Sequence, residues 1–190
     1  MEKEQLREQT LEKRNALDLD DIMEKSNAIN EKLFTLKEVQ DAECVLFYSS
    51  KDSEVRTMEM VEEALSRGKR VAMPVLRKKD ADLMFVEVES SAGLQKNEMG
   101  VPQPSENNKV AITPEELDLI VAPNVAFAEN GNRLGQGFGF FDKIFEKSTA
   151  KRVGLAFDLQ LVEDVPIEEH DQALDIIVTE AGIYRKKAPV

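Results

Sequence analysis

The sequence predicts an α/β fold in which a mostly parallel sheet is covered by helices on both faces. Short, wholly apolar runs such as 119–122 are typical of parallel strands that are buried on both sides. Segments with a helical period stand between these runs, so that consecutive strands have crossover connections. The 190 residues are interpreted as one domain, 1–190, long enough to bury a core.

Four helices are predicted from capping residues and from apolar positions that recur at a helical period. Asp18 and Asp20 are candidate N-caps of the second helix, Thr57 can cap the third, and Gly68 is a natural residue for the third helix's C-terminal end. The expected helices cover residues 3–17, 18 to about 37, 57–68 and 141–147.

Strands are predicted at the apolar runs 45–48, 71–75, 83–88, 119–122, 153–157 and 176–179. Residues 89–116 are polar and contain three prolines, which predicts a long connection. A connection of this length is often functional, and 89–116 is a candidate lid over a substrate. Asn130-Gly131 is a strong turn signal after the fourth of these strands. Because parallel sheets bind ligands at the carboxyl ends of their strands, the segment after 119–122 is the first place to search for a site.

Charge and composition exclude several classes of function. A formal net charge of −12 argues against general nucleic-acid binding, which needs a broad basic surface. It leaves an anionic ligand possible, because a few basic side chains, backbone N–H groups and Mg²⁺ can hold a triphosphate. No apolar run approaches the roughly 18 residues of a membrane span, and the charged N-terminus lacks the apolar stretch of a signal peptide. The single cysteine, Cys44, lies in an apolar run and is expected to be a buried structural thiol, which favours the cytoplasm.

A glycine-rich segment carries the clearest functional signal. Gly135, Gly137 and Gly139 alternate just before a predicted helix. Glycines of this kind let the backbone approach a ligand closely, and the helix N-terminus favours a phosphate. Arg133 can contact that phosphate, and Asp142 offers an oxygen ligand suited to Mg²⁺. The alternative interpretation is a tight strand-to-helix turn whose glycines serve only packing.

The segment from Gly131 to Asp142 also resembles the signature of the 5-formyltetrahydrofolate cyclo-ligases, Gly-Asn-Arg-Leu-Gly-x-Gly-x-Gly followed by two aromatic residues and Asp. Further similarities follow the family's order along nearly the whole chain. They lie at Lys3 and Arg7, 54–57, 118–123, 125–127, 153–157, Gln160, 165–166, 169–171, 174–175 and 178–180.

The resemblance implies a three-layer α/β fold, with a nucleotide site at the glycine-rich loop. It also implies ATP- and Mg²⁺-dependent conversion of 5-formyltetrahydrofolate to 5,10-methenyltetrahydrofolate, with release of ADP and phosphate. Arg133 and Asp142 would be the catalytic residues, and Asp142 and Asp171 would hold Mg²⁺. The ATP-binding residues would be Lys3, Arg7, Arg133, Leu134, Gly135, Gln136, Gly137, Phe138, Gly139 and Phe141. The substrate-binding residues would be Tyr48, Ser49, Glu54 and Phe140. His170 is given no role.

The sequence departs from the family's pattern at four positions. Phe140 and Phe141 stand where two tyrosines are common, and Gln136 and Phe138 stand where Tyr or a basic residue and Gly or Lys are frequent. Two alternatives therefore stay open: a related pterin as substrate, or a protein that binds nucleotide or pterin without turnover. A different α/β enzyme that acts on a phosphosugar or an acyl-CoA has only fold analogy behind it. A monomer is favoured.

Overall fold

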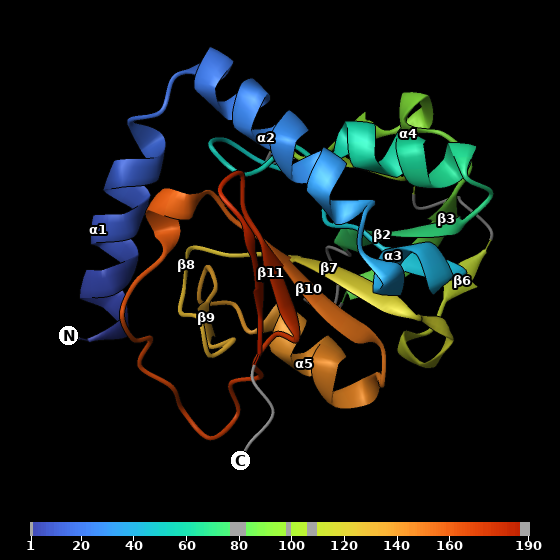
Figure 1. The fold of residues 1–190 in the computed structure, drawn as a ribbon. Coiled ribbons are helices and arrows are strands. Elements are labelled where there is room, and N and C mark those ends of the chain that lie inside the picture. Colours follow the sequence, from blue (N-terminus) through green and yellow to red (C-terminus); the bar gives the residue numbers. More distant parts are fainter. Residues whose placement is uncertain (1, 77–82, 98–99, 106–109, 187–190) are drawn as a thin grey trace.

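The computed structural model describes residues 2–76, 83–97, 100–105 and 110–186, and within them a twisted sheet forms the centre of the molecule (Figure 1). Its strands lie in the order β12 (Ile183–Arg185), β11 (Ile176–Val178), β10 (Lys151–Leu155), β7 (Leu119–Pro123), β1 (Cys44–Leu46), β2 (Arg70–Leu76), β3 (Leu83–Val88) and β6 (Ala111–Ile112). The strands from β11 to β2 pair in parallel, whereas β12, β3 and β6 are antiparallel. The predicted mostly parallel sheet is confirmed.

Helices cover both faces of the sheet, as predicted. One face packs on α2 (Leu19–Leu33), α3 (Lys37–Asp41) and α4 (Met58–Ser66) through a core that includes Ile29, Met60 and Phe47. The opposite face packs on α5 (Phe140–Lys147) through Ile144 and Phe145. The result is a three-layer α/β/α arrangement, with α1 (Lys3–Asn15) standing at the side of the sheet (Figure 1). No helix of the described residues is long and apolar enough to cross a bilayer.

The second helix is shorter than predicted, because it ends at Leu33 and not near Lys37. Asp18 is its N-cap, and the carboxylate accepts a hydrogen bond from the backbone N–H of Asp21. Leu33, Phe34 and Leu36 are all buried. A continuous helix would point these three side chains in different directions, so the chain turns after Leu33 and α3 follows as a separate helix.

Thr57 occupies the N-cap position of α4, but its hydroxyl donates to the carbonyl of Tyr48 and makes no cap hydrogen bond. Gly68 ends this helix with a positive φ of 77°, as expected. Cys44 is buried, and burial raises the pKa of its thiol to about 11. Burial and a raised pKa are what we expect of a structural thiol.

The connection at 89–116 has more structure than its composition predicts. In its described part, β4 (Gln95–Lys96) pairs with β5 (Pro102–Gln103), and β6 extends the main sheet beside β3. Two 3₁₀ turns, η1 (Ser91–Gly93) and η2 (Pro114–Glu116), complete it. Residues 98–99 and 106–109 lie outside the described residues, and whether this connection acts as a lid stays a prediction.

The carboxyl end of β7 is held in place by buried hydrogen bonds. Asn124, which follows this strand, donates from Nδ2 to the carbonyl of Leu155, and its own carbonyl accepts from Gln160 and Arg14. A Cβ atom added at Gly154 on the neighbouring β10 would lie 2.4 Å from Asn124 Nδ2. A residue without a side chain is therefore required there, and the strand end that leads into the candidate site is fixed.

Candidate active site

The glycine-rich loop lies between a β-hairpin and α5. The hairpin pairs β8 (Ala126–Phe127) with β9 (Arg133–Leu134), and Asn130-Gly131 forms its turn as predicted. Gly137 and Gly139 take positive φ angles of 96° and 64°, which side chains disfavour. No side chain caps α5 within the described residues, so the first N–H groups of this helix are available to a ligand.

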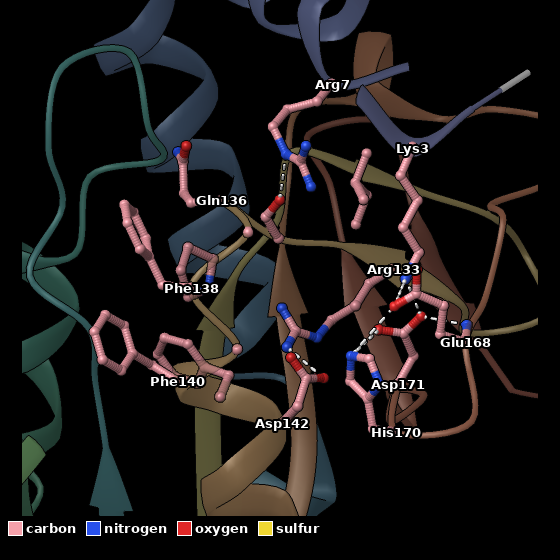
Figure 2. A pocket seen from close by; sticks show the side chains of 16 residues that line it. Lys3, Arg7, Arg133, Gln136, Phe138, Phe140, Asp142, Glu168, His170 and Asp171 are labelled. Carbon is pink, nitrogen blue, oxygen red and sulfur yellow. Dashed lines mark hydrogen bonds and ion pairs between the residues drawn. The ribbon is translucent and has the colours of Figure 1, made fainter. Parts of the chain in front are cut away.

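A cavity of about 340 Å³ opens on this loop, here called the loop cavity. Figure 2 shows Lys3 and Arg7 reaching into it from α1, with Phe138 and Phe140 on one side and Glu168, His170 and Asp171 on the other. Its lining comprises Lys3, Arg7, Pro123, Arg133–Phe141, Asp142, Glu168, His170 and Asp171. Every residue expected to bind ATP or metal thus lines one cavity.

Arg133 is the most buried cation of the loop cavity. Its side chain is 4% exposed, and its Nη2 donates to Asp142 Oδ1 at 3.0 Å. The guanidinium carbon lies 5.2 Å from the ring centre of Phe145. Burial lowers the pKa of Arg133, and the neighbouring Asp142 opposes this shift. Its buried Nε has no hydrogen-bond partner among the described residues, which is the arrangement expected of a group that meets a ligand.

Lys3 and Arg7 both reach the loop cavity from α1, but they contact different parts of it. Lys3 Nζ lies 2.5 Å from Asp171 Oδ2 and 3.2 Å from Glu168 Oε2. Burial tends to lower the pKa of Lys3, but its hydrogen bonds to Asp171 and Glu168 outweigh this effect and raise it. Arg7 Nε donates to the carbonyl of Gly135 at 3.1 Å, so it holds the glycine loop directly.

Both carboxylates expected to bind metal retain an oxygen that makes no hydrogen bond among the described residues. Asp142 uses Oδ1 to accept from Arg133 and from the backbone N–H of Gln172, which leaves Oδ2. Asp171 uses Oδ2 to accept from Lys3 and from the backbone N–H of Glu168, and its Oδ1 makes no hydrogen bond in the described part of the chain but lies 3.9 Å from His170 Nε2. Single oxygens from two carboxylates fit Mg²⁺, which usually takes one or two carboxylates besides phosphate and water oxygens.

A second cavity of about 220 Å³, here called the apolar cavity, adjoins the first. The four residues expected to bind substrate, Tyr48, Ser49, Glu54 and Phe140, all line it. The hydroxyl of Tyr48 already donates to the carbonyl of Val55 at 2.8 Å, so Tyr48 contributes a wall and not a donor. Ser49 Oγ is buried and unpartnered among the described residues, and it is available to a ligand.

Among the described residues, Glu54 is the one buried acid that lines the apolar cavity, with 8% of its surface exposed. Burial raises the pKa of its carboxyl, against hydrogen bonds from Lys51 and Gln136 and the charge of Arg14. Glu54 Oε2 accepts from the backbone N–H of Lys51 at 2.9 Å, and Oε1 accepts from Gln136 Nε2 at 3.4 Å. A buried carboxylate of this kind can accept hydrogen bonds from ring N–H groups.

The two cavities meet at Pro123, Gln136, Phe140 and Phe141, which line both. The side chain of Phe138 is exposed and stacks on Phe140, with ring centres 5.7 Å apart. A ligand in the loop cavity and a ligand in the apolar cavity would therefore be neighbours at this aromatic boundary.

Sequence reasoning misses the contribution of Arg14. It is 3% exposed, and its Nε donates to Ser53 Oγ at 3.0 Å, beside Glu54. A signal existed, since Arg14 follows Arg7 by seven residues and shares its helix face. His170, which was given no role, lines the loop cavity with Nε2 3.4 Å from Glu168 Oε2.

The fold and these cavities define an α/β protein that joins a cationic glycine-loop site to a second, largely apolar site at the carboxyl edge of its sheet. The family model of the 5-formyltetrahydrofolate cyclo-ligase family matches residues 1–180. The 5-formyltetrahydrofolate cyclo-ligase of Escherichia coli is 32% identical over 177 residues, covering 91% of this chain and 97% of that protein. The mouse protein of the same name is 26% identical over 186 residues, covering 92% of each.

Solved structures agree. The 5,10-methenyltetrahydrofolate synthetase of Aquifex aeolicus superposes with a TM-score of 0.87 at 28% identity, covering 100% of this chain and 95% of that one. That of Mycoplasma pneumoniae, at 24% identity, shares the fold with a TM-score of 0.75 over 95% of this chain and 99% of that one. The chain belongs to the 5-formyltetrahydrofolate cyclo-ligase family, ligases of folate one-carbon metabolism.

Proposed function

We propose that this chain converts 5-formyltetrahydrofolate to 5,10-methenyltetrahydrofolate with consumption of ATP, in a reaction that requires Mg²⁺ and releases ADP and phosphate. The observation that carries the proposal is the junction of the two cavities at Phe140 and Phe141. A phosphate held by Arg133 in the loop cavity would there meet a formyl group held in the apolar cavity.

The ATP phosphates would lie along residues 135–139 at the N-terminus of α5, where backbone N–H groups and the helix dipole favour negative charge. The chain as a whole has a net charge of −12, but Lys3, Arg7 and Arg133 would make the loop cavity locally attractive to a phosphate. The unpartnered Nε of Arg133 is the donor best placed to contact the transferring group.

Asp142 and Asp171 would hold Mg²⁺ through their remaining carboxylate oxygens. When bound, this ion would neutralise part of the phosphate charge. The ion pairs of Asp142 with Arg133 and of Asp171 with Lys3 keep both carboxylates at the edge of the loop cavity.

The folate would place its pterin ring in the apolar cavity, where Glu54 accepts from ring N–H groups and Phe140 packs against the ring or the formyl group. Ser49 Oγ offers a further hydrogen bond. Tyr48 and Phe141, which line this cavity, would help to exclude water from the reacting atoms.

The chemistry requires positioning more than a protein nucleophile. The γ-phosphoryl group passes from ATP to the formyl oxygen, and ADP leaves. N10 of the folate then attacks the activated formyl carbon. The C–O bond breaks, phosphate departs with the former formyl oxygen, and the N10 proton is lost to solvent. Arg133 would stabilise the charge on the transferring group throughout.

A single domain, a monomeric state and a cytoplasmic location remain predictions from the sequence. A related pterin in place of folate is a second possible substrate. It is motivated by Phe140 and Phe141, which lack the hydroxyls common in the family.

The test mixes purified protein with 5-formyltetrahydrofolate, ATP and Mg²⁺, and follows methenyl absorbance together with ADP release. We expect equal amounts of both products, and loss of both in Asp142→Ala. Asp41→Ala is the matched control, because Asp41 is an exposed carboxylate that pairs only with Lys37 in the described residues. Tight binding of both ligands without turnover would instead favour a non-catalytic role.

A further inference from the structure

Gln136 occupies an unusual place, because it lines both the loop cavity and the apolar cavity. It stands in the glycine loop between Gly135, whose carbonyl accepts from Arg7, and Gly137, whose φ is 96°. Its backbone therefore belongs to the segment expected to contact phosphate, while its side chain points away from that segment to Glu54.

Glu54 depends on Gln136 for its orientation. Of its two carboxylate oxygens, Oε2 is fixed by the backbone N–H of Lys51. In the described part of the chain, Oε1 accepts a hydrogen bond only from Gln136 Nε2. A buried carboxylate oxygen without a donor is costly, so this amide has a disproportionate influence on where Oε1 points.

The Gln136–Glu54 hydrogen bond is long, at 3.4 Å between donor and acceptor. This separation exceeds the roughly 2.7–3.2 Å that is usual for N–H···O hydrogen bonds, so the contact is a weak one. A small movement of the glycine loop onto a phosphate that carried Gln136 toward Glu54 would shorten this contact and strengthen it. The carboxylate in the apolar cavity would then respond to occupancy of the loop cavity.

We propose that Gln136 is a positioning residue that couples the two sites, so that a nucleotide in the loop cavity tightens binding of the folate-type substrate through Glu54. The inference rests on the proposed function. Coupling through one charge-assisted hydrogen bond is expected to raise substrate affinity about fivefold to tenfold. Linkage requires the substrate to tighten nucleotide binding by the same factor.

The coupling is measured by calorimetry of 5-formyltetrahydrofolate binding, with and without Mg²⁺ and an ATP analogue whose β–γ bridge is nitrogen. The wild type should show a ratio of about five to ten between the two affinities. In Gln136→Met, which keeps length and volume but has no donor, the ratio should fall to about one. Gln9→Met, on an exposed part of α1, is the matched control and should keep the wild-type ratio.

Steady-state kinetics and nucleotide binding together separate positioning from a general distortion of the loop. Gln136→Met should raise KM for 5-formyltetrahydrofolate about fivefold at saturating ATP. The Kd of the ATP analogue, measured without 5-formyltetrahydrofolate, should stay within about twofold of the wild-type value. Gln136→Asn, one methylene too short to reach Glu54, should behave alike. In a Glu54→Gln background, Gln136→Met should cause little further rise in KM for 5-formyltetrahydrofolate, since both substitutions act on one contact.

An unchanged affinity ratio in Gln136→Met, a wild-type ratio of one, or weaker binding of the ATP analogue to Gln136→Met in the absence of 5-formyltetrahydrofolate would overturn the inference and leave the proposed function standing. Failure of the wild type to bind 5-formyltetrahydrofolate at all would overturn the proposed function, and the inference with it.

Discussion

Replacing Arg133 by methionine should damage stability and activity for two different reasons. The side chain of Arg133 is buried and pairs with Asp142 at 3.0 Å. Breaking a buried ion pair by removing one partner costs about 3–5 kcal/mol. Because the Asp142 side chain is 18% exposed and keeps its hydrogen bond from Gln172, we expect a smaller loss, about 2–3 kcal/mol.

The activity of Arg133→Met should fall by about 10²–10³ in kcat/KM, the range for one lost donor to developing charge. The double variant Arg133→Met with Asp142→Asn separates the two effects. It removes both charges, so the free energy of unfolding should recover by more than half of the loss. Urea denaturation and the methenyl absorbance assay measure the two quantities. Recovery of activity together with stability would refute the assignment of Arg133 to phosphate, and so would a fully active Arg133→Met.

Three further predictions concern other parts of the molecule. Burial raises the pKa of Glu54, so the stability of the wild type declines as pH rises through that pKa. Glu54→Gln should therefore have a higher Tm than the wild type at pH 7, measured by calorimetry. This difference in Tm should vanish below about pH 4, where Glu54 is protonated in both the folded and the unfolded state. Gly154→Ala places Cβ 2.4 Å from Asn124 Nδ2 and should cost about 2–3 kcal/mol in urea denaturation, whereas Gly182→Ala, with no atom within 4 Å, should be near neutral. Lys3→Met should raise KM for ATP about tenfold at low salt and by less at high salt; an unchanged KM would remove Lys3 from the phosphate site.

The sheet and its main helices could be predicted because their signals are local. The apolar runs at 119–122 and 176–179 match the bounds of β7 and β11 to within one residue, and the glycine cluster correctly indicated the start of α5. The turn at Asn130-Gly131 was predicted, but the strands β8 and β9 beside it and the edge strand β12 were not, since two or three residues carry too little pattern.

The site was less predictable wherever it depends on contacts between distant segments. The hydrogen bond of Gln136 to Glu54 joins residues 82 positions apart, and that of Arg14 to Ser53 joins residues 39 apart. The pattern of residues along the chain does not indicate such a contact, because the fold brings together segments that are distant in the sequence. The fold also places Lys3 Nζ 2.5 Å from Asp171 Oδ2. The family resemblance implies ATP binding by Lys3 and Mg²⁺ binding by Asp171, but it does not specify a contact between them.

The most direct test of the central claim follows the formyl oxygen. With 5-formyltetrahydrofolate labelled by ¹⁸O in the formyl group, turnover by the wild-type protein with ATP and Mg²⁺ should yield phosphate that carries the label, measured by mass spectrometry. One labelled oxygen per phosphate is expected, because the γ-phosphoryl group is transferred to that oxygen before ring closure. Unlabelled phosphate, with the label in water, would contradict phosphoryl activation.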